Sequence, residues 1–313
     1  MSDASVLRWL LESDPAIRWQ VLAGLTDAPE TEVDEQRSRI ATEGWGKALL
    51  DRQSPHGYWD DGNDDGWMIA MDALALLRDF GLEPQSDVAQ RAVERVDANL
   101  RWETLDNRPY FDGETEPCIN GSILASGSYF GRRCDAIVDR LLREQLADGG
   151  WNCDAPPSVR SSFNSTIRVL EGLIEHERRW GYDAAVTAAR KKGEEYFLER
   201  HMLRRLSTGE IVDRGWTRFT FPTMWHYDVL RGLDYFRSTG AEPDERAAEA
   251  VEIVQARRHQ NSRWPMNYLH RSRLDFPMET QTGRASRWNT LRAMRVLDWY
   301  FKRPKRSLTS NAR

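Results

Sequence analysis

Carboxylate and imidazole side chains gather at two places in the chain where their spacing suits proton transfer. The stretch "WDDGNDDGW" contains Asp64 and Asp65, and a carboxyl group crowded by other carboxylates can keep its proton at neutral pH and act as an acid. The stretch "WHYD" contains His226 and Asp228, an imidazole with a carboxylate that can orient it. The alternative at both places is structural, because such side chains also satisfy the ends of helices.

Thiols offer a second kind of chemistry. The chain has three cysteines, Cys118, Cys134 and Cys153, and none of them forms a CxxC pair. We therefore expect no structural disulfides, in keeping with a reducing compartment. Cys118 and Cys153 could meet His226 in a zinc site, but their spacing gives that alternative no support. The prediction is no metal and no cofactor, with Cys118 as a small buried side chain.

Two sets of helical segments have to position these residues. Six segments carry apolar residues at i, i+3, i+4 and i+7 with charged residues between them, the pattern of a helix with one buried face. These outer segments are Ser5–Glu12, Thr31–Arg52, Asp87–Leu100, Arg133–Leu146, Asp183–Arg204 and Asp244–Arg258. Six inner segments are poorer in charge, as expected of helices inside a layered all-α protein. They contain "DPAIRWQVLAGLTD", "GWMIAMDALALLRDFG", "PCINGSILASGSYFG", "SSFNSTIRVLEGLIEHE", "FPTMWHYDVLRGLDYF" and "SRWNTLRAMRVLDWYF".

The composition of the chain excludes several classes of protein. A net charge of -5 over 313 residues argues against a nucleic-acid-binding surface. No uninterrupted apolar run approaches the ~18 residues of a membrane span, and the N-terminus "MSDASVLRWLLESDP" lacks the features of a secretory signal. We expect a soluble, cytoplasmic protein with a single domain at 1–302 and a basic, disordered tail at 303–313.

One phrase, a Gln followed by a polar turn and a Trp, occurs three times before an inner segment. The copies are Gln53 with Trp59, Gln145 with Trp151, and Gln260 with Trp264. A glycine, Gly57 or Gly150, precedes the Trp in the first two copies but not in the third. Outer and inner segments alternate strictly along the chain and the unit repeats at roughly 45 to 65 residues, which indicates a closed ring of helical hairpins.

The phrase resembles the QW-type repeat of the superfamily that contains squalene-hopene cyclases, other terpenoid cyclases and protein prenyltransferase β-subunits. The resemblance implies an (α/α)6 toroid of six inner and six outer helices over nearly the whole chain. In that superfamily the Gln caps the end of an inner helix and the Trp stacks on the turn. We therefore expect Trp59, Trp151 and Trp264 to be structural.

The same resemblance implies an apolar or isoprenoid-like small molecule in the central cavity, with cyclase, lyase or transferase chemistry at its mouth. Class II terpenoid cyclases use a DxDD motif, in which Asp64 would be the central Asp and Asp65 the next, but Gly62 occupies the first position. Those enzymes generally hold their substrate between two barrels, and this chain has room for one. Prenyltransferase β-subunits bind zinc through Asp, Cys and His, and no cysteine adjoins "WHYD".

In a toroid, the N-terminal ends of the inner helices converge on one mouth, where free N–H groups favour an anionic group. The expected catalytic residues there are His226, Asp228, Asp64, Asp65 and Asp154. The expected substrate-binding residues are Arg287, Trp288, Asn289, Trp225, Cys118, Asn120, Glu116, Asn164 and Trp67. Arg287 suits a bidentate grip on a carboxylate or diphosphate, and aromatic walls would stabilise a developing carbocation.

Two hypotheses follow for the function. In the first, the chain is an enzyme of terpenoid cyclase or prenyltransferase type, whose partner is a small apolar substrate. In the second, it is a non-catalytic toroid that holds a ligand or a protein. A deep cavity that His226, Asp228 and Arg287 point into would favour the enzyme, and a cavity plugged by Trp and Met would favour the scaffold. The sequence predicts no oligomeric state.

Overall fold

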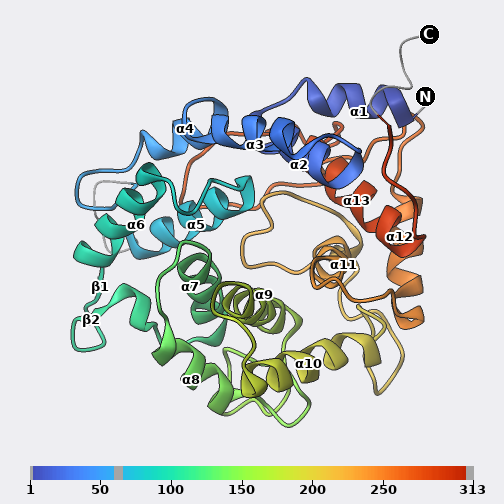
Figure 1. Ribbon diagram of the computed structural model, residues 1–313. Helices are drawn as coiled ribbons and strands as arrows, with labels where there is room; N and C mark the ends of the chain where they lie inside the picture. The colour runs from blue at the N-terminus through green and yellow to red at the C-terminus, as the bar shows by residue number, and fades with distance from the viewer. Residues whose placement is uncertain (1–2, 60–65, 308–313) are drawn as a thin grey trace.

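The computed structural model describes residues 3–59 and 66–307 of the chain, and its regular elements are almost all helices, joined by loops. The predicted all-α class is confirmed. Figure 1 shows one set of helices arranged around a centre and a second set outside the first. No helix in the described part of the chain is both long and apolar enough to cross a membrane.

The inner helices match the inner segments. They are α2 (Pro15–Leu25), α5 (Gly66–Phe80), α7 (Pro117–Tyr129), α9 (Phe163–Trp180), α11 (Val229–Ser238) and α13 (Arg287–Tyr300). Helix α7 packs on α5 and α9, and α11 packs on α13. Helix α13 in turn contacts α2, so that the last inner helix returns to the first.

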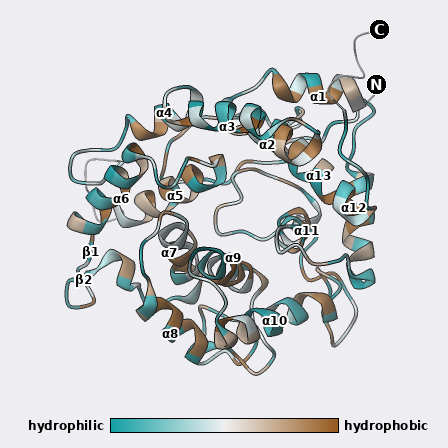
Figure 2. Ribbon diagram, viewed as in Figure 1, coloured by the Kyte–Doolittle hydropathy of each residue, from teal (hydrophilic) through white to brown (hydrophobic). Residues whose placement is uncertain are grey.

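The outer helices lie further from the centre (Figure 1), and each mixes hydrophilic and hydrophobic residues along its length (Figure 2). They are α1 (Asp3–Leu11), α3 (Glu30–Ser38), α4 (Gly44–Leu50), α6 (Asp87–Asn99), α8 (Asp135–Glu144), α10 (Ala184–Glu199) and α12 (Ala248–Ala256). Helix α8 illustrates the pattern, because it buries Ile137, Val138 and Leu141 and leaves charged residues between them. This is the single buried face that its sequence predicts.

Two predicted helices differ from the observed ones. The helix expected over Thr31–Arg52 is divided into α3, a 3-10 turn and α4, because Gly44 adopts a left-handed conformation with φ of 62°. The Asp14 carboxylate accepts the N–H of Ala16 at the start of α2 and the N–H of Trp45 in the first turn of α4. The helix expected from the stretch "FPTMWHYD" begins only at Val229, after this stretch has passed through a loop.

Two smaller segments were not expected as they appear. Residues Arg101–Trp102 (β1) and Arg108–Pro109 (β2) pair as a short antiparallel hairpin, although the sequence showed no strand pattern. The segment 303–307, the first part of the predicted tail, lies against α2 and α13. The Arg306 guanidinium pairs with Asp298, and its backbone N–H donates to the Leu25 carbonyl at 3.0 Å.

The three tryptophans of the repeated phrase occupy equivalent positions. The indole N–H of each donates to the carbonyl ten residues earlier, near the end of the preceding outer helix: Trp59 to Leu49, Trp151 to Leu141 and Trp264 to Val254, at 2.7–2.8 Å. All three side chains are buried. Each indole therefore fastens the polar turn to the outer helix before it, as an aromatic side chain with one polar atom can.

The glutamines connect neighbouring hairpins, but through outer helices rather than at an inner-helix end. The Gln53 amide donates to the Ala92 carbonyl in α6, and the Gln145 amide donates to the Ala189 carbonyl in α10. Gln260, in the copy without the glycine, is exposed. The first two copies thus join consecutive hairpins through one amide each.

Helices α7 and α9 approach each other more closely than side chains would normally allow. A Cβ atom at Gly121 would lie 2.6 Å from the Arg168 backbone, and one at Gly172 would lie 2.6 Å from the Gly121 carbonyl. Only glycine fits such a contact between two backbones. This contact fixes the starts of α7 and α9, and with them the side chains of Cys118 and Arg168, next to one another.

Candidate functional site

A pocket of about 710 Å³ opens at the N-terminal ends of α5, α7 and α9. We call it the mouth pocket. Its apolar wall consists of Trp67, Met68, Met71, Ile119, Met224 and Trp225. The location agrees with the expectation that the inner-helix starts converge, and Met and Trp side chains give a wall that adapts to an apolar ligand.

Two buried charged side chains, Asp72 from α5 and Arg168 from α9, face this pocket. Asp72 is 8% exposed and its carboxylate accepts a hydrogen bond from the Ser272 hydroxyl at 3.2 Å. Burial raises the pKa of Asp72, and the charge of Arg168 and the Ser272 hydrogen bond oppose that rise only in part. A carboxyl group that holds its proton beside an apolar wall is a candidate acid.

Arg168 is 4% exposed, yet its guanidinium makes no hydrogen bond and no ion pair with any residue that the structure describes. Burial, and next the charge of Arg231, lowers the pKa of Arg168. A buried charge without a partner is costly, and proteins normally pair it. Because the side chain faces a pocket, the missing partner is one that a ligand can supply.

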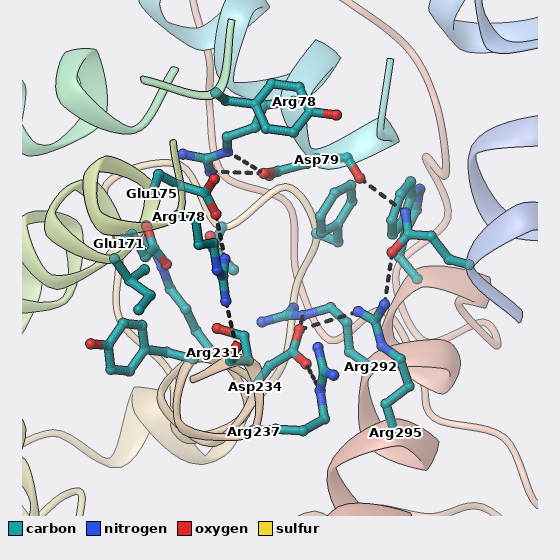
Figure 3. Close-up of a pocket in the computed structure, with 18 residues that line it drawn as sticks. Arg78, Asp79, Glu171, Glu175, Arg178, Arg231, Asp234, Arg237, Arg292 and Arg295 are labelled. Carbon is teal, nitrogen blue, oxygen red and sulfur yellow. Dashed lines mark hydrogen bonds and ion pairs between the residues drawn. The ribbon is translucent and has the colours of Figure 1, made fainter. Parts of the chain in front are cut away.

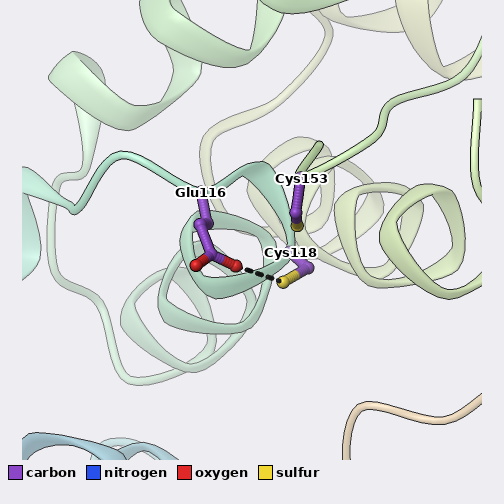
Figure 4. A group of neighbouring side chains, drawn as sticks. All are labelled: Glu116, Cys118 and Cys153. Carbon is purple, nitrogen blue, oxygen red and sulfur yellow. Dashed lines mark hydrogen bonds between the residues drawn. The ribbon is translucent and has the colours of Figure 1, made fainter. Parts of the chain in front are cut away.

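Glu116, Cys118 and Cys153 lie together on the same wall (Figure 4), with one potential ligand atom of each within 4.8 Å of the others. The Cys118 thiol donates to the Glu116 carboxylate at 3.7 Å, and the Ser165 hydroxyl donates to the Cys153 sulfur at 3.3 Å. Hydrogen bonds from Cys118 and Ser165 lower the pKa of Cys153, whereas the Cys153 contact and burial raise the pKa of Cys118. Cys153 is therefore the first of the two to ionise.

Several of the predicted site residues do line the mouth pocket. They are Trp67, Glu116, Cys118, Asp154, Asn164 and Trp225. Asp154 is exposed at the rim. Asn164 also has a structural task, because its amide oxygen accepts the Tyr227 N–H at 2.7 Å and so holds the loop before α11.

The asparagines Asn120 and Asn289 and the carboxylate of Asp228 are engaged in the protein itself. Asp228 is the N-cap of α11, where it accepts the Arg231 N–H at 2.8 Å. Asn120 exchanges two hydrogen bonds with the Glu114 backbone. Asn289 donates to the Pro265 carbonyl at 2.9 Å. All three are almost completely buried and none lines the mouth pocket. This differs from the prediction because backbone groups of the protein, in loops for the asparagines and in the first turn of α11 for Asp228, bind these side chains.

Arg287 and Trp288 also point away from the mouth pocket. The Arg287 guanidinium lies 4.6 Å from the ring centroid of Trp9, a cation–π contact. Trp288 is buried, and its ring stacks on Phe221 with centroids 4.1 Å apart. Neither side chain is placed to grip a ligand in that pocket.

His226 lies outside the pocket lining, in a stack of rings beside it. Its imidazole is parallel to His270 with centroids 3.5 Å apart, and Trp225 covers it with centroids 3.8 Å apart. Burial, and then the charges of Arg231 and Arg168, lower the pKa of His226 to about 4. The third group near Cys118 and Cys153 that could bind a metal is Glu116, not the His226 considered from the sequence. The predicted acidic pair, Asp64 and Asp65, lies outside the described residues.

A second cavity, of about 280 Å³, lies toward the C-terminal ends of the inner helices (Figure 3). We call it the charged cavity. It is lined by six arginines and four carboxylates: Arg78, Arg178, Arg231, Arg237, Arg292 and Arg295, with Asp79, Glu171, Glu175 and Asp234. A narrow space bordered by Asp72, Arg168 and Glu171 lies between the charged cavity and the mouth pocket.

The charges in this second cavity are paired with one another. Arg231 binds Glu171 through two hydrogen bonds of 2.7–2.8 Å. Asp234 lies 2.7 Å from Arg237, 3.3 Å from Arg295 and 3.7 Å from Arg292. Burial would raise the pKa of Asp234, but these three guanidinium groups together hold it well below its ordinary range.

Sequence reasoning missed Asp72 and Arg168, although a signal was available. Each is a charged residue inside an inner segment otherwise poor in charge, in "IAMDALAL" and "STIRVLEGL". Burial of such a residue is unusual without a partner. The predicted site residues lie at the ends of the inner segments, where helix termini attract polar residues, whereas Asp72 and Arg168 lie one to two turns further in.

Comparison with known proteins gives a limited result. No family model matches the sequence, and no curated protein matches it. Among solved structures, the type II terpene cyclase MstE from Scytonema aligns over 90% of this chain and 86% of its own, at 16% identity and a TM-score of 0.43. A variant of MstE in complex with geranylgeranyl dihydroxybenzoate aligns over 93% and 87%, at 16% identity and a TM-score of 0.44. At these values the likeness carries no inference about this chain.

Proposed function

We propose that the chain is a single (α/α)6 toroid that binds a small molecule with an apolar, isoprenoid-like body and an anionic head in the mouth pocket. We further propose that Asp72 is the acid in a cyclase-type, lyase-type or transferase-type reaction of that molecule. The observation that carries the proposal is that two buried charged groups lie beside an apolar wall: Arg168, which makes no hydrogen bond or ion pair with a described residue, and Asp72, which accepts one from Ser272. Perturbed titratable groups in an apolar pocket are the usual mark of a functional site.

The head group of the ligand is assigned to Arg168. Its guanidinium has no partner among the described residues, and it presents several donors in a planar fork that matches a carboxylate or a phosphate. An anion bound there would remove the cost of burying the arginine unpaired. A neutral apolar molecule would leave that cost in place, so the pocket favours an amphipathic ligand.

The proton donor is assigned to Asp72. Its carboxyl proton would pass to a carbon of a carbon–carbon double bond, so that the O–H and π bonds break, a C–H bond forms, and a carbocation remains on the ligand. Trp67 and Trp225 lie in the wall, and the face of an aromatic ring stabilises such a charge. The carboxylate left behind would be stabilised by the Ser272 hydroxyl and by Arg168.

Binding is tested with geranylgeranyl diphosphate and geranylgeraniol as probes, monitored by the change in tryptophan fluorescence. We expect the diphosphate to bind at least ~10-fold more tightly than the alcohol, and Arg168→Met to abolish that preference. Arg287→Met is the matched control, because Arg287 lies on Trp9, outside the pocket, and its removal should leave both affinities unchanged. Equal binding of the two probes by the wild type would contradict the assignment of Arg168.

The acid is tested separately from binding. Asp72→Asn should bind the same probe and yield no product, because the amide fills the same space and cannot donate the proton. Since the acid has to be protonated, wild-type turnover should fall as the pH rises through the raised pKa of Asp72. Turnover is measured by mass spectrometry of the product. Undiminished turnover by Asp72→Asn would show that Asp72 is not the acid.

A non-catalytic ligand-binding protein is the second candidate. It is favoured by two side chains that do not line the pocket: His226 stacks on His270, and Asp228 caps α11. In this case the same probes would bind with the same dependence on Arg168 and would be recovered unchanged. The two candidates therefore share the binding experiment and differ in the product analysis.

A further inference from the structure

We propose that Glu116, Cys118 and Cys153 form a site for a zinc ion, with one coordination position directed into the mouth pocket. The three residues supply two sulfur atoms and one carboxylate oxygen, and these atoms lie within 4.8 Å of one another. Thiolate with carboxylate or imidazole is a ligand set that zinc prefers. The site goes beyond the binding function proposed above and does not depend on it.

The spacing of the ligand atoms suits a zinc ion. With Zn–S bonds of about 2.3 Å and Zn–O bonds of about 2.0 Å, two ligands of a tetrahedral ion lie roughly 3.5 to 3.8 Å apart. The observed distance between the Cys118 sulfur and the Glu116 oxygen is 3.7 Å. A zinc ion can therefore bridge these two atoms at their observed separation, and the Cys153 sulfur lies within 4.8 Å of both.

The ligands come from rigid parts of the fold. Glu116 is the N-cap residue of α7 and Cys118 lies in its first turn. Cys153 follows Trp151, whose buried indole fastens the turn to α8. The close contact of α7 and α9 at Gly121 holds the start of α7, with Glu116 and Cys118, against α9. Cys153 is tied to α9 by the hydrogen bond from Ser165. A preformed ligand geometry of this kind is what a binding site requires and a chance surface cluster lacks.

The surroundings of the cluster also fit a metal ion. Ser165 donates its hydroxyl proton to the Cys153 sulfur at 3.3 Å, a supporting hydrogen bond of the sort that orients metal ligands. Two thiolates, one carboxylate and a zinc ion leave a net charge of -1. The unpaired cation of Arg168 faces the same pocket and interacts electrostatically with Cys118, so it offsets that charge.

All three ligands line the mouth pocket. With three protein ligands, a tetrahedral zinc ion keeps its fourth position for water or for a substrate atom. Closed structural sites use four protein ligands, and a fourth is absent from the cluster among the residues that the structure describes. The geometry thus places a Lewis acid on the wall of the pocket.

The test uses the full chain and the metal alone. The purified, reduced protein is titrated with Zn²⁺ against a chromophoric chelator, and with Co²⁺ while the thiolate-to-cobalt absorption is recorded. We expect one equivalent of metal per chain and a tetrahedral cobalt spectrum. Cys118→Ser and Cys153→Ser should each weaken binding by at least ~100-fold, and Ser165→Ala, which removes only the supporting hydrogen bond, by about 10-fold.

Cys134→Ser is the matched control. Cys134 is buried, its thiol donates to the Arg132 carbonyl, and it lies outside the cluster. This variant should bind metal like the wild type, with circular dichroism to show that every variant is folded. The proposal is overturned if the reduced wild type takes up no zinc, if Cys134→Ser loses metal as strongly as the other two variants, or if the cobalt spectrum shows no thiolate band. None of these outcomes depends on whether an isoprenoid-like molecule binds.

Discussion

The two cavities, toward opposite ends of the inner helices, differ in whether their buried charges form ion pairs. In the charged cavity, Asp234 is shared by three arginines and Glu171 is held by two hydrogen bonds from Arg231. In the mouth pocket, Arg168 has no hydrogen bond or ion pair among the described residues, and Asp72 accepts one hydrogen bond, from the Ser272 hydroxyl, although the two charges influence each other. Helices α5, α7 and α9 line both cavities, whereas α2, α11 and α13 line the charged cavity alone and α11 and α13 supply four of its arginines.

The contrast separates what stabilises the fold from what is available for a ligand. A paired charge in a cavity contributes little net stability, but the removal of one partner is costly because the other remains buried and uncompensated. An unpaired charge costs free energy in the folded protein as it stands, and its removal relieves that cost. Proteins tolerate such costs mainly at functional sites. The comparison can therefore be tested by the sign of a change in stability.

The largest effect is expected in the charged cavity. Asp234→Asn leaves the buried Arg292 and the half-buried Arg237 and Arg295 without their shared carboxylate, so we expect a loss of about 3–5 kcal/mol in the free energy of unfolding. Urea denaturation at neutral pH measures it. Glu242→Gln is the matched control, because it breaks an ion pair to Lys302 in which both side chains are largely exposed, and it should change stability by less than ~1 kcal/mol.

The next effect belongs to the histidine stack beside the mouth pocket. Burial is the main cause that lowers the pKa of His226 and of His270 to about 4, against about 6.5 in the unfolded chain. Between these values the unfolded chain binds more protons than the folded one, so stability falls as the pH drops from about 6.5 to about 4. Because both rings are half-exposed, we expect the stack to account for about 1–2 kcal/mol of that loss.

The measurement for the histidines is a comparison of two pH profiles. Urea denaturation of the wild type and of a His226→Asn, His270→Gln double variant between pH 7 and pH 4.5 isolates their share from that of the carboxylates. The profile of the double variant should be flatter by the amount given above. Parallel profiles would mean that the two rings protonate in the folded protein as readily as in the unfolded chain.

The sequence predicted the helices well because their signals are local. Inner segments such as "GWMIAMDALALLRDFG" and the observed α5 agree to within a residue at their ends, since apolar periodicity and a following glycine mark a helix without reference to the rest of the fold. The repeated Trp was correctly assigned to structure. The division of α3 from α4 was missed because it depends on the contact of Asp14 with Trp45, 31 positions away.

The pocket lies where the sequence places the inner-helix starts, but its lining differs in part from the predicted residues. Cys118, Cys153 and Glu116 do gather at the inner-helix starts, because a position in a hairpin determines that much. Which polar side chains remain free there is decided by three-dimensional neighbours. Asp228 was expected in the pocket and instead caps α11, whereas Arg168 interacts electrostatically with Asp72 and Glu171 but forms no hydrogen bond or ion pair with either. Neither outcome can be read from spacing.

A smaller effect, of opposite sign to that of Asp234→Asn, is expected at Arg168. Arg168→Met replaces a buried, unpartnered cation with an apolar side chain of similar length, so the free energy of unfolding should rise by about 1 kcal/mol. Urea denaturation without ligand measures it. A loss of 2 kcal/mol or more would show that Arg168 has a structural role, and the contrast between the two cavities would then fail.

The smallest change is expected from Trp225, which is 53% exposed at the edge of the mouth pocket and covers His226. Trp225→Ala should alter the free energy of unfolding by no more than ~0.5 kcal/mol, as for other exposed positions. It should nevertheless admit water to the imidazole and raise the pKa of His226 from about 4 toward 6.5, as followed by NMR titration of the ring protons. An unchanged pKa would mean that Arg231 and Arg168, rather than burial under Trp225, keep His226 neutral. In that case the charge of Arg168 would also control the protonation of a histidine outside the lining of the mouth pocket.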